Sequence, residues 1–316
     1  MADTQFELNK NYKSKQPLVS IALCTYNGEQ FLKKQIDSLL QQTYTRLQII
    51  VCDDASRDGT KIILETFDDP RLKKIYNVEN IGYIKNFEQA INLCEGNFIA
   101  LCDQDDIWKP HKIETMLNNI DAAWLLFCDS ELIDENDNFL NKKISDLRNL
   151  QNCKTLPGYV WSNCVWGHAI LMNKNLLSYS LPVPEGAKHD IWLGFTAACL
   201  EKIKYLPESL TLYRQHTTSQ TITLPVKAIR RDQNKRYKDY IEKLQWIKCM
   251  KDFVPNPEIA FFNELHKLYR DLNKTNGIKL FRFLLLNRKK IFSFRKKSYP
   301  SQLNEIRKIC RKVYPE

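Results

Sequence analysis

The chain has 316 residues, of which 43% are hydrophobic and 27% are charged, a composition typical of soluble globular proteins. It contains no run of about 18 apolar residues, which excludes a membrane-spanning helix, and its first 17 residues are too polar for a secretory signal. We therefore expect a cytoplasmic protein with one large domain, or with a domain and an extension.

Ten cysteines are scattered along the chain, and no two form a C-x-x-C pair. The missing pair argues against a thiolate zinc site, and the missing export signal argues against a disulfide framework. Cys52 and Cys102 lie within apolar runs, so we expect them to be small buried side chains.

Positive charge is concentrated towards the C-terminus. Residues 225–316 contain 24 Lys and Arg against 9 Asp and Glu, a net charge of +15 in a chain whose total is +10. Residues 1–224 are therefore net acidic, which indicates two segments with different roles.

Short apolar runs alternate with amphipathic segments through the first 130 residues. In the amphipathic segments the apolar side chains recur every three or four residues, as in a helix with one buried face. This alternation predicts a mostly parallel sheet with helices on both faces. The expected strands are 18–24, 47–54, 72–78, 97–103 and 122–129, and the expected helices are 29–43, 61–67, 82–94 and 110–120.

The pattern changes after this region. Residues 130–157 are polar and weakly patterned, so no element is predicted there. Strand-like runs follow within 162–177 and 202–221, and a helix opening with His189 and Asp190 is expected between them. Beyond Pro225 the spacing is helical, with little strand signal.

Polar clusters fall where three of the expected strands end, at 25–27, 53–56 and 103–106. Ligands of open α/β sheets bind at the carboxyl ends of the strands. The chain has no phosphate-binding G-x-x-x-x-G-K-[ST] loop and no G-x-G-x-x-G fingerprint. The polar clusters therefore predict a ligand site of another kind.

Three aspartates, Asp103, Asp105 and Asp106, follow the fourth expected strand. Two carboxylates about 4 Å apart repel by roughly 4 kcal/mol at an effective dielectric of about 20. A divalent cation removes this repulsion, and Mg²⁺ or Mn²⁺ suits oxygen ligands at a partly open site. The alternative is structural: Asp105 or Asp106 caps the helix expected near Pro110.

These clusters together resemble the motifs of family 2 glycosyltransferases, which have the GT-A fold. The matching segments are Thr25-Tyr26-Asn27, then D-D-A-S-R-D-G-T from Asp53 to Thr60, then D-Q-D-D from Asp103 to Asp106. The likeness extends over about residues 17–222. The D-Q-D-D-I-W form and the His189-Asp190 pair resemble the rhamnosyltransferase-like branch.

The resemblance implies a role for each matching residue towards a nucleoside-diphosphate sugar. Asp54 would accept a hydrogen bond from the imide N–H of the base, and Asp103 would hold the ribose. Asp105 would bind the Mg²⁺ or Mn²⁺ that bridges the phosphates, with His216 completing the metal site. The residues implied to line the nucleotide and diphosphate pocket are Thr25, Tyr26, Asn27, Asn80, Gly82 and Lys85.

Asp190 matches the general base of the family, where many members have Glu-Asp in place of His189-Asp190. It would take the proton from an acceptor hydroxyl that attacks the anomeric carbon, through an oxocarbenium-like state and with inversion. Structural alternatives stay open for Asp54 and Ser56 (a turn or a cap), for Asp190 (a helix cap) and for His216 (a surface or core histidine). Trp166 and Trp192 are better explained by core packing than by sugar stacking.

We expect three segments: a polar N-terminal segment at 1–17, a GT-A domain at 18–224 and a helical basic region at 225–316. In residues 281–297, aromatic and aliphatic side chains alternate with Lys and Arg. This pattern favours equally a peripheral contact with an anionic membrane face and a helical bundle beside the domain. Nucleic-acid binding is disfavoured, because the body is acidic and no such motif occurs.

The predicted function is an inverting, metal-dependent glycosyltransferase. Its acceptor would be a glycan or a lipid-linked sugar, in cell-surface polysaccharide synthesis, and its donor a UDP- or dTDP-sugar. The alternatives are a sugar nucleotidyltransferase, disfavoured because only Gly28 follows the first strand, and a membrane adapter that has lost catalysis. A D-x-D-x-T phosphatase is less favoured still, because Thr25 stands where its nucleophile would be.

Overall fold

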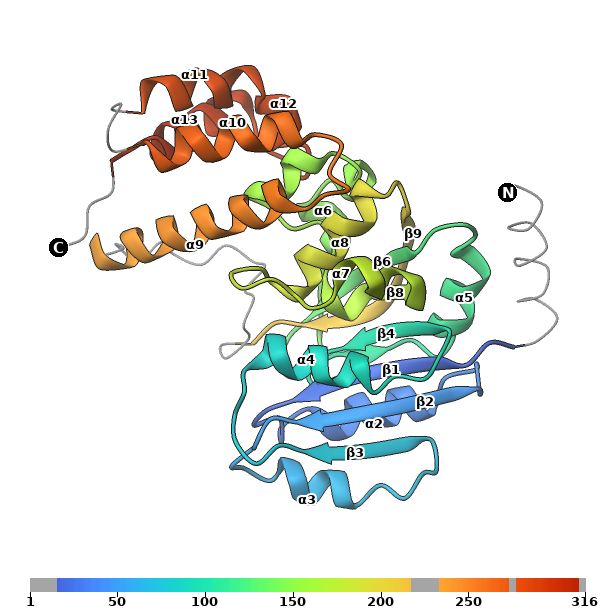
Figure 1. The fold of residues 1–316 in the computed structure, drawn as a ribbon. Coiled ribbons are helices and arrows are strands. Elements are labelled where there is room, and N and C mark those ends of the chain that lie inside the picture. The colour runs from blue at the N-terminus through green and yellow to red at the C-terminus, as the bar shows by residue number, and fades with distance from the viewer. Residues whose placement is uncertain (1–15, 217–232, 273–276, 313–316) are drawn as a thin grey trace.

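A computed structural model of the chain describes residues 16–216, 233–272 and 277–312. Its described strands form one nine-stranded sheet in the order β3-β2-β1-β4-β8-β6-β9-β5, with β7 paired to β6 (Figure 1). The strands are β1 (Val19–Thr25), β2 (Leu47–Asp53), β3 (Leu72–Tyr76), β4 (Phe98–Cys102), β5 (Ile107–Trp108), β6 (Leu125–Ile133), β7 (Phe139–Lys143), β8 (Ile170–Asn173) and β9 (Ile203–Arg214).

The first four strands are parallel, and β1 lies between β2 and β4. Every residue of β1 and β4 is buried, as expected for strands covered on both faces. Helices alternate with these strands as predicted, so the α/β fold class is confirmed. The first helices are α2 (Leu32–Leu40), α3 (Thr60–Glu65), α4 (Tyr83–Asn92) and α5 (Lys112–Asn119).

The sheet contains elements that the sequence pattern did not predict. β6 continues to Ile133, and β7 pairs with its end, inside the stretch interpreted as weakly patterned. All but one of the β7 side chains are exposed, so no apolar alternation marks it. The two-residue strand β5 pairs with β9, Ile107 opposite Leu212, and this pairing brings the Asp103–Asp106 loop to the end of β9.

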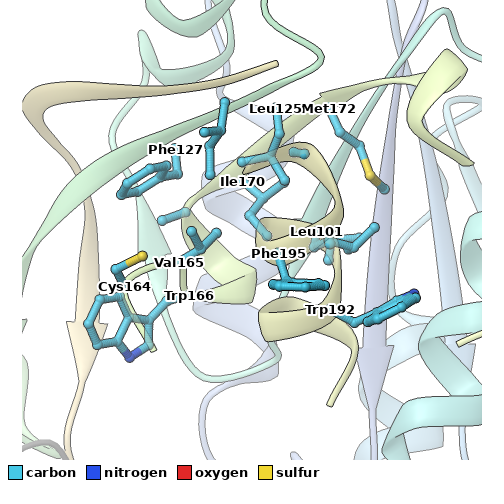
Figure 2. Close-up of a cluster of buried hydrophobic side chains, with 14 of the residues drawn as sticks. Leu101, Leu125, Phe127, Cys164, Val165, Trp166, Ile170, Met172, Trp192 and Phe195 are labelled. Carbon is cyan, nitrogen blue, oxygen red and sulfur yellow. The ribbon is translucent and has the colours of Figure 1, made fainter. Parts of the chain in front are cut away.

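Helix α8 (His189–Cys199) packs its apolar side chains into the main core. Figure 2 shows Phe195 and Trp192 of α8 close to core side chains from β4, β6 and β8. Trp166 and Trp192 are 8% and 4% exposed, which confirms that both belong to the core. All ten cysteines lie in the described ranges as free thiols, and Cys52 and Cys102 are buried, as predicted. The short helices nearby are α6 (Ile144–Leu147) and α7 (Leu177–Ser180), with 3₁₀ turns at Leu150–Asn152, Leu156–Val160, Gly167–Ala169 and Lys174–Leu176.

The basic C-terminal region is helical and packs on the sheet domain. Trp246 donates from Nε1 to the Tyr159 carbonyl at 3.0 Å, and the Phe294 ring meets the Tyr159 ring edge-on at 4.9 Å. The predicted boundary at 224–225 and most of the 1–17 segment lie outside the described residues. The helices are α9 (Gln233–Asp252), α10 (Ile259–Arg270), α11 (Ile278–Leu286), α12 (Arg288–Ile291) and α13 (Tyr299–Ile309).

Among the helices of the described ranges, none combines the length and the apolar character that crossing a bilayer requires.

Candidate active site

The three polar clusters meet at the carboxyl ends of β1, β2 and β4. Gln104 connects two of them: its Oε1 accepts hydrogen bonds from Thr25 Oγ1 at 2.7 Å and from the Tyr26 amide at 2.8 Å, and its Nε2 donates to the Tyr26 carbonyl. A Cβ on Gly28 would lie 2.3 Å from Gln104 Oε1, so only glycine leaves room for this contact. The D-Q-D-D motif and the Thr-Tyr-Asn segment therefore form one unit.

Asp54 orders the segment after β3. Its carboxylate is buried and accepts hydrogen bonds from Asn77 Nδ2 at 3.0 Å and from the amides of Ile81 and Gly82, both at 2.9 Å. Gly82 has φ of 85°, a conformation that favours glycine. The side chain of Asn80 donates to the Asp54 carbonyl at 3.2 Å. Asp54 thus positions Asn80 and Gly82, while its predicted bond to a base stays a prediction.

The remaining predicted pocket residues lie at the same edge of the sheet. Tyr26 is 42% exposed and Thr25 is buried. Asn27 is left-handed, with φ of 50°, and its Oδ1 accepts the Arg57 amide at 2.9 Å. Lys85 is exposed in the first turn of α4. Exposed polar groups around a buried strand end are suited to a ligand that approaches from solvent.

Asp103 and Asp106 converge on a buried histidine. The Nδ1 atom of His168 lies 3.5 Å from Asp106 Oδ2 and 3.9 Å from Asp103 Oδ2. Ligand atoms of these three residues lie within 4.8 Å of one another, which is close enough to hold a metal ion. His168 was not predicted from the sequence, because a lone buried histidine has no signal in the sequence pattern.

Burial and mutual repulsion control the protonation of this cluster. Burial, then the carboxylates of Asp105 and Asp190, raise the pKa of Asp103 to about 7. Burial, then Asp105 and Asp103, raise the pKa of Asp106 well above its usual range. Burial lowers the pKa of His168 far below its usual range, so its ring is neutral. The neutral His168 ring therefore does not compensate the negative charge that Asp103 and Asp106 carry when they ionise.

Lys112 supplies a buried positive charge beside the cluster. Its Nζ donates to the His168 carbonyl at 2.5 Å and to Thr211 Oγ1 at 2.9 Å, and lies 3.5 Å from the centre of the Trp108 ring. Burial lowers the pKa of Lys112 to about 8, which leaves it largely charged at neutral pH. The charge partly offsets the repulsion among the carboxylates.

Asp105 points to the end of β9 and meets His216. Its Oδ2 lies 2.9 Å from His216 Nε2, with side-chain exposures of 20% and 10%. The two predicted metal ligands, 111 positions apart, are therefore brought together. The alternative that Asp105 or Asp106 caps the next helix is wrong: α5 begins at Lys112, and His111 is at the N-cap.

Arg214 holds this arrangement in place and was not identified from the sequence. Its backbone amide donates to Asp106 Oδ1 at 2.9 Å, its Nε donates to the Asp105 carbonyl at 2.8 Å, and its guanidinium lies over the Phe31 ring. The ring of Phe31 also contacts His216, with centroids 5.0 Å apart. Arg214 stands two residues before His216 in the sequence, but this position alone does not reveal its contacts with Asp105 and Asp106.

Asp190 lies in the first turn of α8, facing the cluster. Asn163 Nδ2 donates to its Oδ2 at 2.7 Å, and the Ile191 amide donates to its Oδ1 at 2.8 Å. A Cβ on Gly167 would lie 3.9 Å from both Asp103 Oδ2 and Asp190 Cβ, and 3.3 Å from His189 Nε2. The predicted base is thus held close to the predicted donor site. The N-cap of α8 is Lys188, so Asp190 does not cap this helix.

Comparison with known proteins identifies the family. The family model described as Glycosyl transferase family 2 matches residues 20–177, which contain all three polar clusters. The chain belongs to glycosyl transferase family 2. The predicted family and the GT-A fold are therefore confirmed.

Curated members of family 2 resemble part of the chain. An uncharacterized glycosyltransferase of Haemophilus influenzae is 30% identical over 216 residues, 63% of this chain and 66% of that protein. The Escherichia coli protein WfgD, named UDP-Glc:alpha-D-GlcNAc-diphosphoundecaprenol beta-1,3-glucosyltransferase, is 30% identical over 188 residues, 56% of this chain and 69% of its own length. The chain thus matches about two thirds of the length of these family 2 relatives.

Solved structures match the fold over a longer stretch than the curated sequences. S. aureus TarS residues 1–349 in complex with UDP has a TM-score of 0.57 and 16% identity, covering 93% of this chain and 88% of that one. The mannosyltransferase PcManGT from Pyrobaculum calidifontis, in complex with GDP-Man and Mn²⁺, has a TM-score of 0.51 and 16% identity, covering 96% and 85%. At such identities the likeness establishes the fold of this family 2 chain and nothing finer.

Proposed function

We propose that this family 2 protein is an inverting, metal-dependent transferase that moves a sugar from a UDP-sugar to the hydroxyl group of a lipid-linked or glycan acceptor. One observation carries the proposal: Asp190 lies beside Asp103, at the same sheet edge where Asp105 contacts His216, although these residues come from distant parts of the chain. WfgD, by its name, uses UDP-Glc and a diphosphoundecaprenol-linked acceptor, and TarS has been solved with UDP. These relatives favour UDP over dTDP; the rhamnosyltransferase-like branch stays a prediction.

Asp105 and His216 are the residues that would hold the divalent cation. Their facing atoms are 2.9 Å apart, and adjacent ligands of an octahedron with bonds of about 2.1 Å are separated by about 3 Å. Both side chains are partly accessible, which leaves room for phosphate oxygens. Asp106 and His168 are enclosed, so they fit a supporting role better. When bound, such a cation supplies electrostatic stabilisation of the departing diphosphate.

Asp190 would act as the general base. Its two oxygens are oriented by Asn163 and by the Ile191 amide, so the carboxylate needs little reorganisation to accept a proton. The acceptor hydroxyl would lose its proton to Asp190 while its oxygen attacks the anomeric carbon opposite the leaving diphosphate. One direct displacement inverts the anomeric configuration, and no covalent enzyme nucleophile is involved.

The decisive experiment measures glucose transfer from UDP-glucose to α-GlcNAc-diphosphoundecaprenol with Mn²⁺, using the full chain. We expect Asp190→Asn to lower transfer about 10³-fold while UDP binding changes less than twofold. Glu185→Gln, an exposed carboxylate near the start of α8, is the matched control and should keep full activity. Full transfer by Asp190→Asn would reject the base assignment. UDP binding without transfer to any acceptor by the wild type would favour the catalytically inactive adapter.

We further propose that α11 contacts the anionic surface of the cytoplasmic membrane face, where a lipid-linked acceptor is presented. Leu280 and Leu284 are buried against the neighbouring helices, whereas Ile278 and Leu286 are 72% and 73% exposed. Figure 1 shows α10, α11, α12 and α13 together at the end of the molecule opposite β3. On the helical wheel of α11 the exposed aliphatic side chains lie on the same face as two exposed basic ones, Lys279 and Arg282.

Vesicle flotation tests this surface. Each basic residue at an anionic surface adds about 1 kcal/mol, so Lys279→Glu/Arg282→Glu should weaken binding to vesicles containing phosphatidylglycerol at least tenfold. Lys61→Glu/Lys73→Glu makes the same charge change on the sheet domain and should have little effect. Equal binding to purely zwitterionic vesicles, or capture of RNA in their place, would contradict a role for α11 at the membrane.

A further inference from the structure

The imidazole ring of His189, the first residue of α8, is buried in the site. Only 5% of the His189 surface is exposed to solvent. Within the described ranges, neither Nδ1 nor Nε2 of its ring has a hydrogen-bond partner. Most buried polar atoms in native proteins are paired, because an unpaired one lowers stability. The exception at His189 therefore needs an explanation, and a missing ligand is one.

Packing, rather than hydrogen bonding, fixes the orientation of this ring. It stacks on Phe87 with centroids 4.3 Å apart and an interplanar angle of 21°, and it meets Tyr83 edge-on at 5.9 Å. Both aromatic residues belong to α4, whose first turn follows Gly82. Burial lowers the pKa of His189, so the ring is neutral and offers one donor and one acceptor nitrogen.

The Nε2 atom faces a position where the chain has no side chain. A Cβ on Gly167 would lie 3.3 Å from His189 Nε2 and 3.9 Å from Asp103 Oδ2. Gly167 is not among the residues with positive φ, so its backbone does not require glycine. Because Gly167 has no side chain, it does not fill the space beside His189 Nε2 and Asp103 Oδ2, so these atoms can approach a ligand closely.

We propose that His189 Nε2 hydrogen-bonds a hydroxyl group of the donor sugar, in a subsite completed by Gly167 and the carboxylates of Asp103 and Asp190. A sugar hydroxyl both donates and accepts, which matches a neutral imidazole beside two acceptors. A phosphate group would be repelled by the two carboxylates. The contact of His189 with α4 places it on the side of the predicted diphosphate segment, Asn80–Lys85, and therefore favours the donor over the acceptor.

This inference rests on the proposed function, and a binding experiment separates the two. Calorimetry with Mn²⁺ measures the affinity of the full chain for UDP, UDP-glucose and UDP-N-acetylglucosamine. His189→Phe keeps the stacked ring and removes both nitrogens. We expect it to weaken at least one UDP-sugar five- to tenfold while leaving UDP within twofold, and we expect His189→Gln, which can still hydrogen-bond, to recover part of the loss. His266→Phe on α10 is the matched control and should change neither the affinity for UDP nor the affinity for the UDP-sugars.

Thermal unfolding without ligand gives an independent readout. His189→Phe removes two unpaired buried nitrogens and enlarges the ring by only one atom, so its Tm should rise by about 1–3 °C. A lower Tm, or equal weakening of UDP and the UDP-sugars, would assign His189 to the framework and overturn the subsite. Unchanged affinity for both UDP-sugars would overturn it as well, with the proposed function intact. Failure of the wild type to bind any of the three nucleotides would remove the proposed function, and the subsite with it.

Discussion

Two loops on either side of β1 end their strands with neighbouring aspartates, yet they are built in opposite ways. After β2, both oxygens of Asp54 accept hydrogen bonds from the segment at 77–82, and both oxygens of Asp53 accept from Ser56. After β4, Asp106 Oδ2 has no hydrogen-bond partner among the described residues, and burial, then the neighbouring carboxylates, raise the pKa of Asp106.

The difference separates carboxylates that the protein satisfies with its own donors from carboxylates that it leaves without them. Protein donors have replaced water around the first pair, so these carboxylates stabilise the fold without a ligand. The carboxylates of the second loop are held together against their repulsion, and a cation or a proton is needed to offset it. A set of carboxylates that repel one another is a candidate functional site, because it adds no stability to the fold without a ligand.

The largest expected effect comes from a substitution in the second loop, the one that follows β4. Asp105→Asn should lower sugar transfer about 10³-fold, because it weakens cation binding where the leaving diphosphate gains charge. Its Tm without metal should stay equal or rise, since one repelling charge is removed. Transfer assays and thermal scans with a chelator check both points. Full Mn²⁺-dependent activity in this variant would contradict the assignment of Asp105.

The second prediction concerns the first loop. Asp54→Ala removes three hydrogen bonds from a buried carboxylate and leaves their donors unpaired, so it should destabilise the protein by about 2–4 kcal/mol. Urea unfolding measures this loss. Asp68→Ala, an exposed aspartate nearby, is the control and should change stability by less than about 0.5 kcal/mol. If Asp54→Ala changed the free energy of unfolding as little as Asp68→Ala, the hydrogen bonds of Asp54 would not stabilise the fold, and the proposed difference between the two loops would be wrong.

The third prediction is a pH dependence. The pKa of Asp103 is about 7 in the folded chain against 3.8 for the unperturbed group, so the folded state binds more protons between these values. Stability of the metal-free protein should therefore fall as pH rises from about 4 to 7. Because 40% of the side chain is exposed, solvent screens the effect, and we expect about 1–2 kcal/mol rather than the full value for an enclosed group.

Asp103→Asn provides the matched comparison for that slope. It should exceed the wild type in stability at pH 8 and equal it near pH 4, because only the ionised carboxyl is costly. Chemical unfolding at the two pH values with a chelator present makes the measurement. Parallel stability curves for variant and wild type would show that Asp103 is not the group responsible.

The smallest expected effect tests how the second loop is anchored. Gln104→Ala removes the contacts to Thr25 and Tyr26 and should weaken UDP binding about three- to tenfold, near 1 kcal/mol, with little change in Tm. Gln104→Glu preserves the acceptor oxygen for both donors and should lose less. An identical loss in both variants would mean that these hydrogen bonds do not position the loop.

Some of the site could be predicted from the sequence because its residues lie in short motifs at strand ends. Asp105, Asp190 and His216 were named from their motifs, and the structure brings Asp105 and His216 into contact. His168, Lys112 and Arg214 could not be found in this way. Each is buried and acts through a partner distant in sequence, and no periodic pattern marks such a pairing.

The sequence alone determined the alternation of strands and helices, the family and the order of its motifs, because these depend on local apolar spacing and on short segments of fixed composition. Only the tertiary structure decided which aspartates are neutralised by protein donors and which repel one another. The two loops are alike in sequence, since each places adjacent aspartates after an apolar strand. Their surroundings differ because the donors of one pair, and the buried Lys112 and His168 beside the other, arrive from strands and helices that only folding brings together.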